Sequence, residues 1–173
     1  MKEEISWGDH TDHLKRALSS DGAFLVVVDK NGKATPMTIG WGTVGRVWSR
    51  PVFTVLVRVS RYTHGCIQDS DSFTVNVPRL GKLKDELLLC GTKSGRDLDK
   101  AAECELSLIP GRAVETPIIE QCALHYECRV VVRKQLQASD FFSPDILDEH
   151  YPFGDHHLVV IGEIVVAYAE SDL

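Results

Sequence analysis

Glycines, arginines and hydroxyl groups occur together in one stretch of the chain, a combination that is typical of anion-binding sites. Gly40, Gly42 and Gly45 in "MTIGWGTVGRVW" have the G-x-G-x-x-G spacing of dinucleotide-binding loops. Such a loop opens a helix, and an acidic residue for the ribose follows about twenty positions later. Here Pro51 begins the strand-like run "PVFTVLVRV", and residues 34–68 contain no Asp or Glu. The context therefore argues against a Rossmann loop.

The same stretch is positively charged in a chain whose formal net charge is −6. Its only formal charges are Arg46, Arg50, Arg58 and Arg61. Arg58 and Ser60 share one face of a predicted strand, and Ser60 is expected to cap a helical turn that begins with Arg61 and Thr63. A helix N-terminus with guanidinium and hydroxyl groups forms a phosphate cradle; chance and surface solvation are the alternative. Arg46 and Arg50 are interpreted as surface charges.

The strand before this cradle has one face with almost no side chains. Alternation along the strand separates two sets of residues, which are Thr38, Gly40 and Gly42 on one face and Met37, Ile39 and Trp41 on the other. A flat ring fits against a bare backbone, although the glycines alternatively only bend the strand at a barrel corner. A flat surface beside a phosphate cradle suggests a mononucleotide with a planar head, and flavin mononucleotide (FMN) fits this description.

Many strands and a few short helices are predicted around this stretch. The strands cover 22–29, 34–41, 51–59, 71–77, 127–136 and 156–170, and the helices cover 78–91, 94–104 and 141–150. The first two strands form a hairpin around an Asn-Gly turn, and Pro36 indicates an edge strand or a bulge. This pattern predicts a mostly-β fold, a barrel, with short flanking helices.

The predicted helices have recognisable ends. In the helix at 78–91, Pro78 lies in the first turn and Gly91 is placed to cap the end. In the last helix, Ser143 is the expected cap and Pro144 the first residue.

The five cysteines are an odd number without a C-x-x-C pair, so reduced thiols are predicted and not a disulfide framework. Cys122, His125 and Cys128 are evenly spaced, which raises a zinc site as an alternative. On a strand, however, an offset of three places His125 on the face opposite both cysteines. We therefore expect no metal, and two buried cysteines on one strand face.

Composition limits the class of protein. Hydrophobic residues make up 43% and charged residues 25% of the 173 positions, which is typical of one globular domain. The negative net charge argues against nucleic-acid binding, and no apolar run is long enough to span a membrane. The N-terminal "MKEEISWGDH" does not resemble a signal peptide. A soluble, cytoplasmic protein is expected.

Three segments together resemble the flavin reductase-like, FMN-binding split-barrel family and, within it, the flavoredoxin-like branch. They are "MTIGWGTVGRVWSRPVFTVLVRVSRYTHG", "SFTVNVP" and "CGTKSGRDLDK", in that order. The resemblance implies a Greek-key split β-barrel, usually a homodimer, with FMN near the subunit interface. Residues 1–173 then form a single flavin reductase-like domain, with 1–20 as a helical lead-in.

The resemblance also implies which segments contact FMN. The segment at Thr38 to Thr43 would face the ring and ribityl chain, the segment at Arg58 to Thr63 the phosphate, and the segment at Cys90 to Gly95 the ring edge. The implied residues are Thr38, Ile39, Gly40, Trp41, Gly42, Thr43, Arg58, Ser60, Arg61, Tyr62, Thr63, Cys90, Gly91, Lys93, Ser94 and Gly95. Lys93 is the candidate for stabilising the reduced ring, and His125 is a further candidate for approaching a flavin across the dimer. Val59 and Gly40 depart from the family pattern without removing a charged contact.

Two functional classes follow from these expectations. One is an NAD(P)H-dependent flavin reductase, in which hydride passes to N5 of FMN. The other is a non-enzymatic, flavoredoxin-type carrier that exchanges electrons with a partner protein. A split-barrel protein for another phosphorylated ring is a third alternative. No side chain is assigned as a catalytic acid, base or metal ligand.

Overall fold

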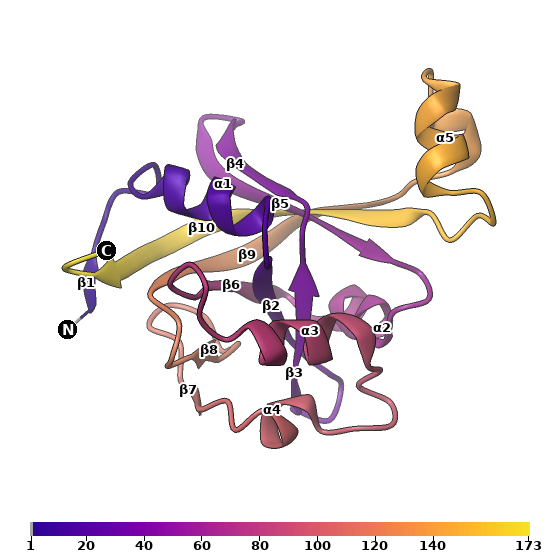
Figure 1. The fold of residues 1–173 in the computed structure, drawn as a ribbon. Helices are drawn as coiled ribbons and strands as arrows, with labels where there is room; N and C mark the ends of the chain where they lie inside the picture. Colours follow the sequence, from indigo (N-terminus) through magenta and orange to yellow (C-terminus); the bar gives the residue numbers. More distant parts are fainter. Residues whose placement is uncertain (1) are drawn as a thin grey trace.

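The computed structural model describes residues 2–173, which form one large antiparallel sheet with short helices around it (Figure 1). The strands are β1 (Lys2–Glu4), β2 (Ala23–Val28), β3 (Ala34–Ile39), β4 (Gly42–Val47), β5 (Arg50–Arg58), β6 (Ser72–Val77), β7 (Leu108–Ile109), β8 (Ile118–Ile119), β9 (Leu124–Gln135) and β10 (His157–Glu170). The helices are α1 (Thr11–Leu18), α2 (Tyr62–Asp69), α3 (Lys84–Thr92), α4 (Lys100–Glu103) and α5 (Pro144–His150), with a 3₁₀ turn, η1, at Ala138–Asp140.

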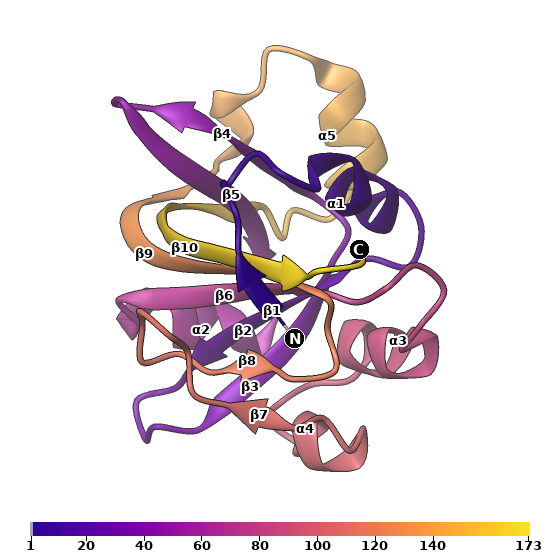
Figure 2. The same ribbon diagram turned by 90° about the vertical axis from the view of Figure 1, so that its left-hand side faces the viewer.

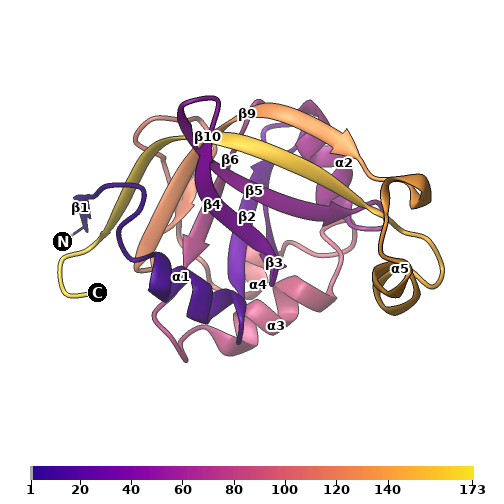
Figure 3. The ribbon, with the colours of Figure 1, turned by 90° about the horizontal axis from the view of Figure 1, so that it is seen from above.

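The sheet is strongly curled, and its two ends are adjacent in the sequence. The strand order is β3-β2-β6-β9-β10-β5-β4, and β1 pairs separately with β10. All of these pairs are antiparallel, and the views in Figures 2 and 3 show the sheet wrapping around an interior. The strand with Pro36 is an edge strand, as predicted. β7 and β8 form a separate small ladder.

Strand β2 separates two apolar cores, which explains its uninterrupted run "AFLVVV". Ala23, Leu25 and Val27 face the main cluster inside the curled sheet. Phe24 and Val26 face a second cluster beneath α3 and α4. A strand buried on both faces needs apolar residues at every position. None of the described helices is long and apolar enough to cross a membrane.

The chain bends sharply at Gly40 and Trp41, where the predicted strand at 34–41 ends two residues early. The expected face of Trp41 is therefore wrong: Met37 and Ile39 are buried, but Trp41 is 44% exposed. After the bend, β4 pairs with β5 in a hairpin that was not predicted. Trp48 and Ser49 in its turn have positive φ angles, a conformation that is not expected from these residue types.

The helix expected at 78–91 begins six residues later, at Lys84. Gly81 and Leu83 have positive φ angles of 79° and 54°, so the chain turns before the helix starts. Gly91 lies inside the helix and does not cap it. A Cβ added there would lie 3.4 Å from Cβ of Thr38. The glycine therefore serves the close approach of α3 to β3.

The helical turn predicted after Ser60 is present and extends to Asp69 in helix α2, but Ser60 is not its cap. Arg61 is the N-cap residue and makes no side-chain capping bond. The helix expected at 94–104 shrinks to one turn in α4, where the side chain of Asp99 caps the amide of Ala102.

His125 lies in the protein core, so its suggested approach to a flavin across a dimer is wrong. It is fully buried, and its ring nitrogens contact Oδ1 of Asn76 at 2.8 Å and the carbonyl of Cys122 at 2.9 Å. Cys122 and Cys128 are also buried, but in different clusters, because Cys122 precedes the strand.

Residues 137–156, here called the arm, stand clear of the barrel at the end opposite the chain termini (Figures 1 and 3). The arm contains η1 and α5, and Pro144 is the first residue of α5, as predicted. Phe142 and Phe153 on the arm are each 98% exposed.

Candidate functional site

Two cavities meet at Arg61 and contain most of the predicted site residues. The strand-bend cavity, about 160 Å³, is lined by Met37, Thr38, Ile39, Gly40, Trp41, Leu56, Arg58, Arg61 and His157. The basic cavity, about 210 Å³, is lined by Ser60, Arg61, Tyr62, Thr63, Thr92, Lys93, Ser94, Gly95, Arg96 and Lys100.

Arg61 ties the three predicted segments together. Its Nη1 donates to the carbonyl of Gly91 at 2.5 Å and its Nη2 to that of Cys90 at 3.0 Å. Thr38 approaches the same helix, because its Oγ1 donates to the carbonyl of Leu87 at 2.6 Å. Cys90 and Gly91 therefore hold Arg61 through their backbone and do not line either cavity. Because these partners are carbonyls, they give the guanidinium no counter-charge, and burial lowers its pKa.

The basic cavity contains four cations and no acidic residue. Lys100 is only 3% exposed, and its Nζ donates to the carbonyl of Cys90 at 3.2 Å. Within residues 2–173, no acid forms an ion pair with Arg61, Lys93, Arg96 or Lys100. Burial lowers the pKa of Lys100, because a buried ammonium without a counter-ion is costly. Thr63 and Ser94 add hydroxyl groups, so the cavity is suited to an anion.

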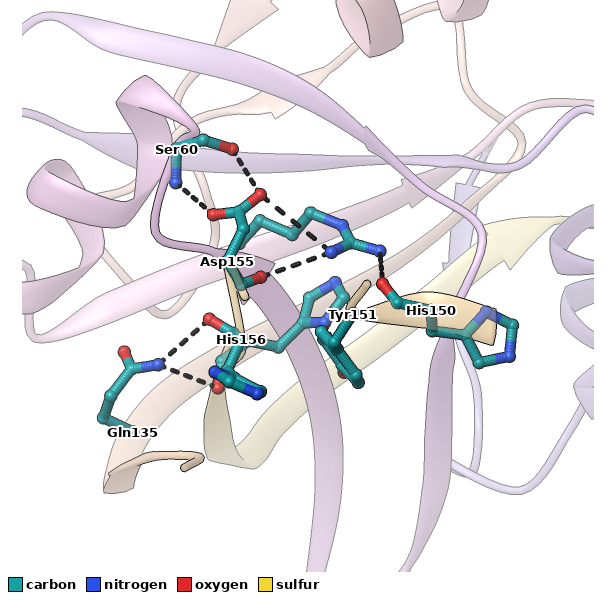
Figure 4. Close-up of polar contacts among 8 residues, drawn as sticks. Ser60, Gln135, His150, Tyr151, Asp155 and His156 are labelled. Carbon is teal, nitrogen blue, oxygen red and sulfur yellow. Dashed lines mark hydrogen bonds and ion pairs between the residues drawn. The ribbon is translucent and has the colours of Figure 1, made fainter. Parts of the chain in front are cut away.

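Arg58 and Ser60 have a different environment, and Figure 4 shows Ser60 beside Asp155. Arg58 donates to the carbonyl of His150 at 3.0 Å and to that of Asp155 at 3.2 Å, and its guanidinium lies 3.9 Å from the Asp155 carboxylate. That carboxylate accepts hydrogen bonds from the amide of Ser60 at 2.8 Å and from its hydroxyl at 2.7 Å. These contacts, here called the arm clasp, fasten the arm to the end of β5.

The arm clasp separates the residues of the expected phosphate cradle into two groups. Arg58 and Ser60 already contact the carboxylate of Asp155. This carboxylate occupies the position at which an anionic ligand would contact them. Arg61 and Thr63 face the cavity without an acid. Asp155 has a φ of 59° and follows Gly154 at 79°, so the arm turns tightly to bring its carboxylate to Ser60.

The strand-bend cavity has a mixed wall of apolar and polar residues, with a histidine at one side. The Trp41 ring lies 5.1 Å from that of His150 and 5.2 Å from that of His157. Nδ1 of His157 contacts the Tyr151 hydroxyl at 2.7 Å. Burial, followed by the charge of Arg58, lowers the pKa of His157 to about 4. The imidazole is therefore neutral at pH 7.

The remaining predicted residues surround these cavities. Gly42 and Thr43 line a groove on the other side of the bend, against α1. Gly95 packs tightly: a Cβ there would lie 2.7 Å from Tyr62 and 2.8 Å from Thr35. A glycine is required for this approach.

Sequence reasoning missed four residues of the site: Arg96, Lys100, Asp155 and His157. Arg96 and Lys100 lie in the quoted segment "CGTKSGRDLDK", but no local signal indicates that Lys100 is buried. Asp155 meets Ser60 across 95 sequence positions, so only the fold reveals the contact.

A separate groove near Asp29, Asp71 and Glu115 contains no predicted site residue.

The sequence and structure have recognisable relatives. Residues 17–173 match the model of the flavin reductase like domain family. An uncharacterised protein of Archaeoglobus fulgidus is 33% identical over 130 residues, which are 75% of this chain and 71% of that protein. A flavoredoxin from Methanosarcina acetivorans has a TM-score of 0.68 at 30% identity, over 86% of this chain and 68% of that one. An FMN-binding domain of a flavin reductase-like enzyme from Shewanella baltica has a TM-score of 0.69 at 19% identity, over 99% and 78%.

The curled antiparallel sheet defines a mostly-β barrel protein, and one of its two adjoining cavities is lined by cations. The chain belongs to the flavin reductase-like domain family. The structural relatives confirm the predicted split-barrel fold class.

Proposed function

We propose that this protein is an FMN-binding oxidoreductase, and that it works as an NAD(P)H-dependent flavin reductase. Family membership supports the cofactor. The basic cavity is the observation that supports the location of the FMN site. In this cavity the buried Lys100 and Arg61 have no acidic partner among the lining residues. A phosphate monoester supplies the missing negative charge, so the residues present fit FMN.

Each cavity takes one part of the cofactor in this proposal. Arg61, Thr63 and Lys100 hold the phosphate through charge-assisted hydrogen bonds. Thr38 to Trp41 face the ring and the ribityl chain in the strand-bend cavity, with His157 at its wall, and Gly42 and Thr43 continue this surface in the groove against α1. Lys93 to Gly95 close the space between these parts. Bound FMN supplies two-electron redox chemistry, while the protein binds and orients it and excludes water.

The electron donor in this proposal is a reduced nicotinamide, from which hydride passes to N5 of the flavin. Hydride transfer between two bound rings needs close alignment more than it needs a protein acid or base. We therefore assign positioning to the residues of both cavities and no catalytic residue.

A flavoredoxin-type electron carrier is the second candidate. The 30% identity to a flavoredoxin over 86% of this chain favours it. A carrier would hold FMN in the same cavities and receive electrons from a partner protein instead of a nicotinamide. The two candidates share every residue assigned above and differ only in the donor.

One anaerobic experiment tests both the cofactor and the donor. The purified protein is titrated with FMN and with FAD, and the FMN complex is then mixed with NADH or NADPH. Tighter binding of FMN is expected, because its single terminal phosphate carries nearly two negative charges, whereas each esterified phosphate of FAD carries one. Bleaching of the flavin by a nicotinamide supports the reductase. Bleaching only by dithionite supports the carrier, and equal affinity for both flavins contradicts the phosphate assignment.

We also propose that the protein is a cytoplasmic homodimer with FMN near the subunit interface. The arm supports this proposal, because Phe142 and Phe153 are almost fully exposed, and Trp48 at the β4–β5 turn is 60% exposed. Exposed aromatic residues of this kind mark interaction surfaces. Sedimentation analysis of the FMN complex should give a dimer; a monomer that retains FMN would contradict it.

A further inference from the structure

The two edge strands of the curled sheet, β3 and β4, are protected to different degrees. β3 is mostly buried, contains Pro36 and packs against α3 and α4. β4 pairs with β5 on one side, and apart from this ladder it makes no backbone hydrogen bond within residues 2–173. Figure 2 shows the β4–β5 hairpin at the outside of the barrel. Proteins usually protect such an edge, because its free amides and carbonyls pair readily with another strand.

The turn of this hairpin determines which backbone groups of β4 point outward. Val47 pairs with Arg50 across a two-residue turn, and both turn residues have positive φ angles. In such a hairpin the pair next to the turn exchanges both hydrogen bonds, and bonded pairs recur at every second position. Pro51, which has no amide hydrogen, lies in one of the non-bonded pairs, opposite Arg46. The β4 residues of the non-bonded pairs direct their amides and carbonyls away from β5; they are Gly42, Val44 and Arg46.

We propose that the β4 edge pairs antiparallel with the β4 edge of a second copy of this chain, about a two-fold axis at Val44. This inference rests on the homodimer proposed above and names the surface that forms it. With Val44 opposite the partner's Val44, Gly42 lies opposite the partner's Arg46, so all three outward residues form hydrogen bonds. Moving the axis by one residue in either direction leaves one of the three unpaired. The two-fold register therefore follows from the hairpin geometry.

A second copy also suits this edge in charge and size. Arg46 is the only charged residue of β4. The register places it opposite a glycine and separates the two Arg46 residues by four positions, roughly 14 Å along the strands. Like charges directly opposite each other, which would destabilise the pair, are thereby avoided. Because the same patch serves both subunits, the contact closes at two copies and does not continue into a fibre.

The same register covers the exposed apolar side chains of this region. Val47, Trp48 and Trp41 are all exposed. Val47 and Trp48 extend past the end of the partner's β4, towards the partner's strand bend at Gly40 and Trp41. Gly40 and Trp41 line the strand-bend cavity, so each subunit supplies its Trp48 to the mouth of the other subunit's cavity. The site proposed for the flavin ring is then complete only in the dimer.

Residue-resolved amide hydrogen exchange tests the pairing in the wild-type protein, with and without FMN. In the dimer, the three outward amides of β4 should exchange as slowly as the amides that bond to β5. After dilution to the monomer, the outward amides should exchange at least about tenfold faster, while the amides bonded to β5 stay protected. This alternation along one strand supports the proposal, and no substitution is needed to observe it.

A pair of introduced cysteines tests the register. The proposed pairing places Thr43 opposite the partner's Gly45 in a non-bonded pair, whose Cα atoms lie about 4.5 Å apart, within reach of a disulfide. Thr43 is exposed, and a Cβ at Gly45 would meet no atom within 4 Å, so both positions accept cysteine. Thr43→Cys/Gly45→Cys should form a covalent dimer when treated with diamide. Thr43→Cys alone is the matched control and should not, because the two copies of residue 43 are more than about 7 Å apart.

Truncating the tryptophan tests its contribution to the partner's cavity. Trp48→Ala should weaken FMN binding several-fold in a fluorescence titration, and its dimer should dissociate at higher protein concentration than the wild type. Val131→Ala, which truncates an exposed valine on β9, is the matched control and should change neither quantity.

Other results overturn the proposal at identifiable points. A dimer in sedimentation whose outward β4 amides exchange rapidly refutes the β4 pairing and leaves the homodimer standing. Efficient cross-linking of Thr43→Cys alone refutes the register. Unchanged FMN affinity in Trp48→Ala refutes the contribution to the partner's cavity. A monomer that binds FMN refutes the homodimer and the pairing together, whereas a dimer with protected β4 amides and no FMN binding refutes the proposed cofactor and not the pairing.

Discussion

The two ends of the segment Arg58–Thr63 contain the same kinds of side chain, but the fold gives them different partners. Arg58 and Ser60 contact the carboxylate of Asp155 and hold the arm. Arg61 and Thr63 face a cavity without an acid, and backbone carbonyls hold the Arg61 guanidinium.

This difference shows that a basic segment is not by itself an anion site. An arginine already paired with a carboxylate gains little from a phosphate, because the new contact replaces an existing one. An arginine held by carbonyls is positioned without being neutralised, and a buried lysine beside it increases the demand for a negative charge. The partner across the fold therefore decides the function of each residue.

The largest expected effect comes from removing the buried charge of the basic cavity. Lys100→Met should weaken FMN binding by about 2–4 kcal/mol, the usual cost of truncating one partner of a buried charge pair. Fluorescence titration measures this loss. Lys30→Met, which removes an exposed lysine of the same formal charge, is the matched control. Equal losses in the two variants would show that only net charge matters.

The next effect separates the two arginines directly. Arg61→Ala should weaken FMN binding by about 1.5–3 kcal/mol, the scale of a hydrogen bond to a charged group. Arg58→Ala should cost less than about 1 kcal/mol in binding, because Asp155 already neutralises that guanidinium. Calorimetry with both variants gives the ratio. If Arg58→Ala costs as much as Arg61→Ala, the arm clasp does not shield Arg58.

The barrel was easier to predict from the sequence than the site. The alternating and apolar runs locate β2, β3, β5, β6, β9 and β10, because a half-buried strand restricts every second residue. Turns were missed where ordinary residues adopt positive φ angles, as at Leu83 and at the β4–β5 turn. The same limit applies to the site: Arg61 and Thr63 follow from local chemistry, but Lys100 and Asp155 act through contacts distant in sequence.

The folding stability of the protein should depend on pH through His157, which lies next to the arm. Burial lowers the pKa of His157 to about 4, below its ordinary value of 6.5. The unfolded chain therefore binds a proton that the folded chain does not, and His157 costs stability as the pH falls from 6.5 towards 4. This contribution is about 3 kcal/mol once the pH is below both values. Urea unfolding at several pH values should show a shallower acid loss for His157→Gln; an identical slope would contradict this assignment.

Removing the clasp carboxylate should lower stability without lowering FMN affinity. Asp155→Asn loses an ion pair and weakens two hydrogen bonds to Ser60, so it should destabilise the protein by about 1.5–2 kcal/mol. The freed Arg58 then adds positive charge near the cofactor, and FMN affinity should not fall. Denaturant unfolding and FMN titration of one preparation test both statements. Loss of affinity in proportion to stability would mean that the clasp also shapes the cavity.

The smallest effect concerns Lys93. Its substitution shows whether this lysine lies near the flavin ring or near the phosphate. Lys93 is exposed and lines the basic cavity beside Ser94, but the family resemblance assigns its segment to the ring edge. A cation at the ring edge stabilises the negative charge of the reduced flavin more than it stabilises the neutral oxidised ring. Lys93→Met should then retain oxidised FMN and lose about 1.4 kcal/mol of preference for the reduced form.

For a two-electron couple, this loss lowers the midpoint potential by about 30 mV, which a spectroelectrochemical titration resolves. A lysine on the phosphate would behave differently, because the phosphate charge does not change on reduction. Removal of such a lysine would weaken the binding of oxidised and reduced FMN equally and leave the midpoint potential unchanged. Lys33→Met, a lysine paired with Asp99 outside both cavities, should change neither quantity. The potential therefore tells whether Lys93 acts with the strand bend or with Arg61 and Lys100.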